Sequence, residues 1–302
     1  MIEQTGASLS FTAEEIAAQP RCWERAIALA PEAEGLPATG ERVAVVGCGT
    51  SLFIAQSYAA LRESAGLGET DAFPASEFPY ARAYDRVVSI CRSGTTTEVL
   101  ELLRRTGTPN VAVIGDPTTP IVQIADAVIP LEFADEKSVV QTRFATTAFT
   151  LLRAHLALSE PSLLPADLVA QAEEAVNAPL PEGAVERTQF TFLGAGWTNG
   201  LAHEAALKVR EASGSWTESY PAMEYRHGPI SVTDEHSVTW FFGAPPEGLE
   251  EEVRAAGAVV SASGLDPAAD LIRAQRLAVA VAEHKGLDPD EPRNLTRSII
   301  LT

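Results

Sequence analysis

The stretch RVAVVGCGTS at residues 42–51 predicts the fold class of this chain. Its first half is an uninterrupted apolar run, which is typical of a strand buried on both faces of a sheet. Two glycines follow, and an Ala/Leu-rich helix is predicted over residues 52–63. Strand, glycine turn and helix in this order indicate an α/β protein with a parallel sheet.

The alternation continues along the chain. Before the first predicted strand, the Thr12 hydroxyl is positioned to cap an N-terminal helix by accepting a hydrogen bond from the amide of Glu15. Unalternated apolar strands between helices indicate a parallel sheet covered on both faces. We predict further strands at residues 71–73, 86–91, 110–115 and 127–131, and helices at residues 76–80, 96–105 and 143–158.

A second unit repeats the first. Residues 190–196 match residues 43–49 at an offset of 147, and a helix follows each of the two segments. The sequence therefore predicts two copies of one α/β unit, the second one shortened, with domain bounds at 1–172 and 173–302. In the second copy we expect strands at 238–242 and 258–261, then a helix at 268–285 and no obvious fifth strand.

Composition restricts the classes of function. The chain has 22 Lys and Arg against 41 Asp and Glu, and its net charge of −19 argues against nucleic acid or an anionic membrane as the main partner. Cys22, Cys48 and Cys91 lie far apart, so neither a disulfide framework nor a zinc site is indicated, and a cytoplasmic location fits them. The sequence contains neither a signal peptide pattern nor a run of ~18 apolar residues.

Two polar loops follow strands at one predicted sheet edge. The first, GCGTS at 47–51, offers free amides to a phosphate, although a tight turn needs glycine for steric reasons alone. Leu52 stands where a dinucleotide fingerprint requires a small residue, which disfavours a nicotinamide cofactor. The second loop, SGTTTE at 93–98, suits the oxygens of a phosphomonoester, but Thr95 or Thr96 can also cap a helix without a ligand. Together the loops favour a phosphate pocket.

The second unit carries charged residues at helical spacing. Glu204, Lys208 and Glu211 fall at i, i+4 and i+7, so they share one helix face. An exposed salt-bridged stripe has the same spacing. His227 lies beside a Gly-Pro turn, where a surface histidine is common. Spacing alone does not separate a catalytic role from a structural one.

Six segments in this order resemble the sugar isomerase (SIS) family, in particular the isomerase half of amino-sugar phosphate synthases and the amino-sugar phosphate isomerase/deaminases. The likeness extends from about residue 40 to the C-terminus, and the last three segments are the most specific. They are GCGTS (47–51), ASEF (75–78), CRSGTTTE (91–98), EAALKVRE (204–211), EYRHGP (224–229) and GLDPDEPRNLTRS (286–298).

The resemblance implies two flavodoxin-like subdomains, a homodimer whose active site can borrow a residue from the neighbouring copy, and neither metal nor cofactor. It implies that Glu211 moves a proton between C1 and C2 of a sugar phosphate, that Lys208 lies beside it, and that His227 assists ring opening. Val139 and Gln141 would line the sugar. The residues implied to hold the 6-phosphate are Gly49, Thr50, Ser51, Arg92, Ser93, Gly94 and Thr96.

Three departures modify that expectation. Arg297 stands where the synthases place a lysine that attacks the ketose carbonyl, and a guanidinium cannot form that imine, although it can pair with a phosphate or a carboxylate. Cys91 replaces a serine before the second loop. The chain begins Met1-Ile2-Glu3, without the N-terminal cysteine that releases ammonia from glutamine, so we do not expect a complete glutamine-dependent synthase.

The sequence therefore predicts a phosphosugar isomerase for a ketose, aldose or amino-sugar 6-phosphate, with or without deamination. The alternative is a sensing module that binds a phosphosugar without turnover.

Overall fold

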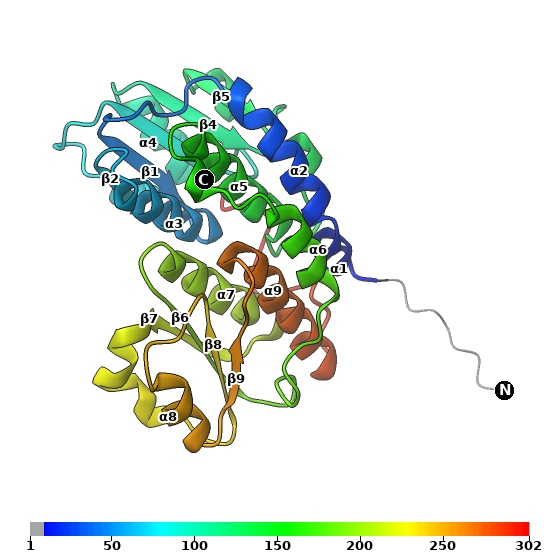
Figure 1. The fold of residues 1–302 in the computed structure, drawn as a ribbon. Helices are drawn as coiled ribbons and strands as arrows, with labels where there is room; N and C mark the ends of the chain where they lie inside the picture. Colours follow the sequence, from blue (N-terminus) through cyan, green and yellow to red (C-terminus); the bar gives the residue numbers. More distant parts are fainter. Residues whose placement is uncertain (1–8, 302) are drawn as a thin grey trace.

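The computed structural model describes residues 9–301. The segment Met1-Ile2-Glu3, on which the expectation about a glutaminase nucleophile rests, lies outside the described residues. Two parallel sheets form the framework of the molecule (Figure 1), which confirms the predicted α/β class with a smaller second sheet. The first sheet has the order β2-β1-β3-β4-β5 and consists of β1 (Val43–Gly47), β2 (Thr70–Pro74), β3 (Arg86–Cys91), β4 (Asn110–Ile114) and β5 (Ala127–Pro130). The second has the order β7-β6-β8-β9 and consists of β6 (Gln189–Gly194), β7 (Trp216–Pro221), β8 (Ser237–Phe241) and β9 (Val259–Ala262).

Helices cover both sheets. The apolar strands β1, β4 and β8 are buried along their whole length, as the unalternated runs predicted. The α-helices are α1 (Phe11–Ala17), α2 (Gln19–Leu29), α3 (Thr50–Ser64), α4 (Thr97–Arg105), α5 (Arg143–Ala157), α6 (Leu168–Asn177), α7 (Thr198–Ser213), α8 (Leu249–Ala255) and α9 (Pro267–His284).

The two sheet units meet through helices. Helix α3 packs against α7 between the sheets (Figure 1). At Gly200 an added Cβ would lie 2.3 Å from Ser57 Oγ and 2.5 Å from the carbonyl oxygen of Phe53, so only glycine permits this close approach. A buried ion pair between Arg153 and Asp266, with two contacts of 2.8 Å, also joins α5 to the start of α9. These contacts bring the N-terminal end of α3 beside the middle of α7.

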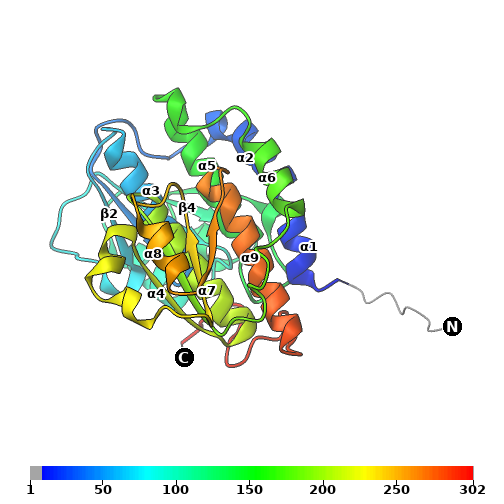
Figure 2. The same cartoon turned by 60° about the horizontal axis from the view of Figure 1, so that its bottom comes forward.

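The C-terminal tail, defined here as residues 287–301, returns from the second unit to the first. It follows α9, and its end lies against the start of α4, where the amide of Thr97 donates to the carbonyl of Ile299 over 3.2 Å. Figure 2 shows this red segment at the bottom of the molecule, near α7 and α4.

Three local predictions were wrong. Ser10, and not Thr12, caps α1, because the Thr12 hydroxyl donates to Asp290 in the tail. The helix predicted at residues 76–80 is only the short 3-10 helix η2 (Ala75–Glu77), since Pro79 disfavours helical backbone before it. Strand β7 was missed, because its sequence WTESYP is mostly polar at an exposed sheet edge.

Helix α6 spans the predicted domain boundary at residue 172 and packs against both α2 and α9, so the boundary stays a prediction, as does the repeat. Within residues 9–301, no helix has the length and apolar character needed to cross a membrane.

Candidate functional site

The two predicted anion loops lie next to each other at the carboxyl edge of the first sheet. Strand β1 leads through Gly49 into α3, and the neighbouring strand β3 leads through Gly94 into α4. Both glycines have left-handed backbone, with φ of 56° and 61°. A Cβ at Gly94 would also lie 2.0 Å from Thr119 Oγ1, so each loop requires glycine for its turn.

The hydroxyls of these loops are gathered at the two helix starts. Thr50, Ser51 and Ser93 are buried, and Ser93 Oγ lies 3.5 Å from Thr96 Oγ1. Thr96 is the N-cap residue of α4, but neither α4 nor α3 has a side-chain cap hydrogen bond, so the expected capping by a Thr95 or Thr96 hydroxyl is not found. The amide of Thr97 already donates to the carbonyl of Ile299 in the tail, so at α4 an anion is favoured by the remaining first-turn amides and by the positive end of the helix dipole.

A chain of hydrogen bonds joins this region to the second unit. The ammonium of Lys208 on α7 donates to Thr50 Oγ1 over 2.8 Å and to Glu211 Oε2 over 2.5 Å. Lys208 is 1% exposed, so the alternative of an exposed salt-bridged stripe is wrong for this residue. The carboxylate of Glu211 is thus two hydrogen bonds from a hydroxyl of the first anion loop, although Thr50 and Lys208 are 158 residues apart in sequence.

Burial and charge set the protonation of this cluster. Burial raises the pKa of Glu204 to about 8, and Glu211 adds to this effect while Lys208 opposes it. Burial lowers the pKa of Lys208, but the carboxyl groups of Glu204 and Glu211 outweigh it and hold that pKa above its ordinary value. Lys208 is therefore a cation at neutral pH, and Glu204 retains its proton there.

Glu204 was not predicted as a site residue. It is fully buried, its Oε1 lies 3.5 Å from Lys208 Nζ, and neither oxygen accepts a hydrogen bond from the described residues. The i, i+4 spacing to Lys208 was the only sequence signal for this contact.

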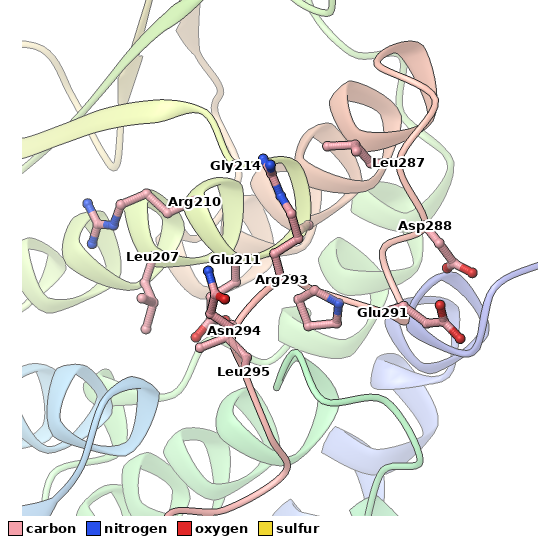
Figure 3. Close-up of a pocket in the computed structure, with 12 residues that line it drawn as sticks. Leu207, Arg210, Glu211, Gly214, Leu287, Asp288, Glu291, Arg293, Asn294 and Leu295 are labelled. Carbon is pink, nitrogen blue, oxygen red and sulfur yellow. The ribbon is translucent and has the colours of Figure 1, made fainter.

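Glu211 also borders a cavity of about 380 Å³ between the C-terminal half of α7 and the tail. Its side chain is 19% exposed, and Figure 3 shows it facing the tail near Asn294. One carboxylate therefore contacts the buried Lys208 and remains accessible. The cavity is lined by Leu207, Arg210, Glu211, Ala212, Gly214, Leu287, Asp288, Glu291, Pro292, Arg293, Asn294 and Leu295.

Arg92 lies directly before the second loop and is 2% exposed. Its Nη1 donates to the carbonyl of Ser138 over 3.0 Å, and its Nη2 donates to the carbonyls of Val139 and Arg297 over 3.3 and 2.8 Å. Glu136 Oε2 lies 3.7 Å from Nη1. Both terminal nitrogens therefore contact backbone carbonyls, while the buried Nε has no hydrogen-bond partner among the described residues.

The predicted sugar-lining residues lie on the segment that Arg92 contacts. Val139 and Gln141 are half-buried, and the buried Oε1 of Gln141 accepts no hydrogen bond from the described part of the chain. From the tail, Arg297 donates to the carbonyl of Glu136 and pairs with Asp135 Oδ1 at 2.6 Å. Of the two partners the sequence allowed for Arg297, the structure contains the carboxylate. No sequence signal pointed to Asp135 or Glu136.

His227 is placed apart from these residues. It ends the 3-10 helix η6 (Ala222–His227), which follows the edge strand β7, and it is exposed. It does not line the cavity beside Glu211. A single copy of the described chain thus brings Thr50, Lys208 and Glu211 together without His227.

Comparison with known proteins identifies relatives of this arrangement. No family model matches the chain. It is 28% identical over 319 aligned residues, and over 87% of its length, to the isomerizing glutamine–fructose-6-phosphate aminotransferase of Caulobacter vibrioides, of which it covers 52%. The chain therefore spans about half the length of the curated relatives it matches.

Solved structures share the two-sheet fold. Glucosamine-6-phosphate deaminase from Thermotoga maritima matches with a TM-score of 0.81 and 22% identity, covering 97% of this chain and all of that one. Tagatose-6-phosphate ketose/aldose isomerase from Escherichia coli matches with a TM-score of 0.75 and 21% identity over 97% of each chain. These similarities confirm the resemblance that the motifs indicated.

Proposed function

We propose that this chain, which resembles the sugar isomerase (SIS) family in its motifs and its fold, is a phosphosugar isomerase that moves a carbonyl between C1 and C2 of a ketose, aldose or amino-sugar 6-phosphate. The observation that carries this proposal is the pair of hydrogen bonds linking Glu211 to Lys208 and Lys208 to Thr50. An anion loop and a carboxylate lie close enough for one small substrate to contact both.

In this proposal the phosphate binds between the two helix starts. Amides and hydroxyls at α3 and α4 donate to its oxygens, and the net charge of −19 does not prevent this because the donors are local. Arg92, Val139, Gln141 and Arg297 border the sugar from the other side. The phosphate ligands are then Gly49, Thr50, Ser51, Ser93, Gly94 and Thr96.

The chemistry requires a base and a donor. The carboxylate of Glu211 takes the proton from the carbon next to the carbonyl, and the electron pair forms the enediolate. The hydroxyl proton on that carbon passes through water to the former carbonyl oxygen, and the carboxyl of Glu211 returns its proton to the former carbonyl carbon, so the carbonyl moves by one position. The cationic Lys208 stabilises the negative charge on the enediolate oxygen. Lys208 serves as a donor and not as an imine-forming amine, because its raised pKa keeps it protonated.

We further propose that His227 acts on substrate from a second copy of the chain. His227 is exposed and does not line the cavity beside Glu211. The edge strand β7, which precedes it, carries Trp216, whose exposed fraction is 77%. Pairing two copies through this region would cover the exposed indole and bring His227 to a neighbouring site as the acid/base for ring opening.

The amine of an amino sugar would leave by hydrolysis. In that reaction water supplies the carbonyl oxygen and ammonia departs, so the net change is isomerisation with deamination. Arg297 supports this direction over amine transfer through a tail imine, because a guanidinium does not form that imine and this one is paired with Asp135.

Proton exchange tests the proposal. The chain is incubated in D₂O with fructose 6-phosphate, glucose 6-phosphate, tagatose 6-phosphate and glucosamine 6-phosphate, and loss of the C1 and C2 proton signals is followed by NMR. We expect exchange with at least one of them, and a rate about 10²–10⁴-fold lower in Glu211→Gln. Glu173→Gln, an exposed carboxyl on α6, is the matched control and should exchange like the native chain.

Absence of exchange with every sugar phosphate that raises the melting temperature would refute the isomerase. The same result, with the melting shift retained in Glu211→Gln, would favour the non-catalytic sensing module. The observation that favours this second function is that Arg297, which stands where the synthases have a reactive lysine, is paired with Asp135.

A further inference from the structure

The tail is attached to the rest of the chain near both of its ends. Near its start, Asp290 accepts from the amides of Phe11 and Thr12 over 2.6 and 2.8 Å and from the hydroxyl of Thr12 over 2.7 Å. Near its end, Thr95 Oγ1 donates to Ser298 Oγ over 3.0 Å, beside the second anion loop. Between these attachments the tail forms one wall of the cavity beside Glu211.

Two arginines connect the tail to residues 135–141, defined here as the sugar segment. Arg92 contacts the carbonyls of Ser138 and Val139 and also the carbonyl of Arg297 in the tail. The guanidinium of Arg297 in turn donates to the carbonyl of Glu136 and to the carboxylate of Asp135. The planar fork of a guanidinium can bind several acceptors in fixed directions, which a lysine ammonium does not do.

The sugar segment is also fixed from its other side. Glu15 on α1 accepts from the Ser138 hydroxyl over 2.5 Å and from the amide of Lys137 over 2.6 Å. Glu136 accepts from the amides of Thr142 and Arg143, each over 2.7 Å, at the start of α5. The segment is therefore anchored on two sides, and Arg92 bonds the tail to this anchored segment.

We propose that Arg92 is a positioning residue that keeps the tail closed over the Glu211 cavity before substrate arrives, with Arg297 as its partner in this contact. This inference deepens the proposed function and rests on it for its catalytic consequence. It differs from the role that the resemblance implies for Arg92, which is direct binding of phosphate. The terminal nitrogens that would serve the phosphate are already bonded to three backbone carbonyls.

Hydrogen–deuterium exchange of the ligand-free chain tests the positioning role without requiring turnover. Arg92→Gln and Arg297→Ala are each expected to raise amide exchange in residues 295–301 by roughly tenfold or more, because each loses charge-assisted hydrogen bonds to the sugar segment. Core amides of β1 should keep native exchange, which separates loss of positioning from general destabilisation. Arg254→Gln, which breaks an exposed ion pair on α8, is the control and should leave the tail unchanged.

The double variant gives a second readout. Since the backbone carbonyl that Arg92 contacts remains in Arg297→Ala, the two arginines hold the tail through separate hydrogen bonds, and Arg92→Gln with Arg297→Ala should exchange faster in the tail than either single variant. Arg297 is 36% exposed, so Arg297→Ala remains informative if Arg92→Gln does not fold.

Phosphate binding distinguishes positioning from direct binding. In melting titrations with inorganic phosphate, positioning predicts an affinity for Arg92→Gln within about twofold of the native value. Unchanged tail exchange in both single variants, or a loss of phosphate affinity in Arg92→Gln with native tail exchange, would overturn the proposal. If the isomerase itself is refuted, these exchange and phosphate results still stand. If the isomerase is confirmed, both variants should lower kcat/KM by about tenfold.

Discussion

The free energy of unfolding of the native chain should fall as the pH rises toward 8, and replacing Glu204 by glutamine should remove this fall. The folded chain holds this carboxyl with a pKa of about 8, against an ordinary value of 4.5, chiefly because the side chain is buried. Below pH 4.5 the group is protonated in both the folded and unfolded chain. Between the two values the folded chain binds a proton that the unfolded chain has released, so raising the pH favours unfolding until about pH 8.

The magnitude follows from the size of the window. One pKa unit corresponds to about 1.4 kcal/mol, so two pH units inside the window cost the native chain roughly 2–3 kcal/mol of unfolding free energy. Glutamine has the same shape and does not titrate. The free energy of unfolding of Glu204→Gln should therefore rise relative to the native chain by that amount between pH 5 and pH 7.

Urea denaturation at pH 5, 6, 7 and 8 measures the difference. Glu173→Gln, on the exposed face of α6, supplies the control, and its difference from the native chain should stay within about 0.5 kcal/mol at every pH. A difference for Glu204→Gln that does not change with pH would refute the reasoning. A native chain that gains stability over the variant as pH rises would mean that ionised Glu204 pairs favourably with Lys208.

Three further outcomes follow from the structure. Gly200→Ala should lower the free energy of unfolding by about 1–3 kcal/mol, measured by urea denaturation, because its Cβ would lie 2.3 Å from Ser57 Oγ between α3 and α7; unchanged stability would show that the helices separate without cost. Asp266→Ala should cost about 3–5 kcal/mol in the same measurement, because it leaves the guanidinium of Arg153 buried without its carboxylate; a loss below about 1 kcal/mol would contradict this. Borohydride added during incubation with fructose 6-phosphate should leave the mass of the native chain unchanged, because Arg297 cannot form an imine; a hexose phosphate adduct found by mass spectrometry would contradict this.

The central strands and their order of appearance could be predicted because each carries its own signal. The run Val43–Gly47 is apolar throughout and is buried on both faces, so its sequence reports its position directly. Strand β7 lacks such a signal because its middle residues Thr217, Glu218 and Ser219 are polar and the strand lies at the sheet edge. An edge position alone does not hide a strand, because the edge strands β2, β5 and β9 were predicted from their apolar residues.

The candidate site was predictable in its parts but not in its contacts. The spacing of Lys208 and Glu211 put them on one helix face, but the hydrogen bond to Thr50 depends on how α3 packs against α7. That packing depends on Gly200, a residue that sequence spacing cannot distinguish from an ordinary helical glycine. Long-range helix contacts of this kind carry no local pattern.

The hydrogen-bond partners of Arg92 could not be predicted from the sequence. The resemblance to the sugar isomerase family implied that this residue binds the phosphate directly. Its observed partners are the carbonyls of Ser138, Val139 and Arg297, the last of them 205 residues away. Backbone carbonyls are present at every position, so no sequence feature marks them as partners.

The charges around the site explain how a chain of net charge −19 can hold an anion. Three cations that contact the loops or the tail beside them are each paired with a carboxyl group, Lys208 with Glu211, Arg92 with Glu136 and Arg297 with Asp135. An arriving phosphate therefore gains less from these cations than from the amides and hydroxyls at the starts of α3 and α4, which carry no opposing charge. Because those donors are fixed by the backbone, they orient the phosphate without moving, and the same rigidity places the sugar carbons of the proposed substrate at a constant distance from the carboxylate on α7.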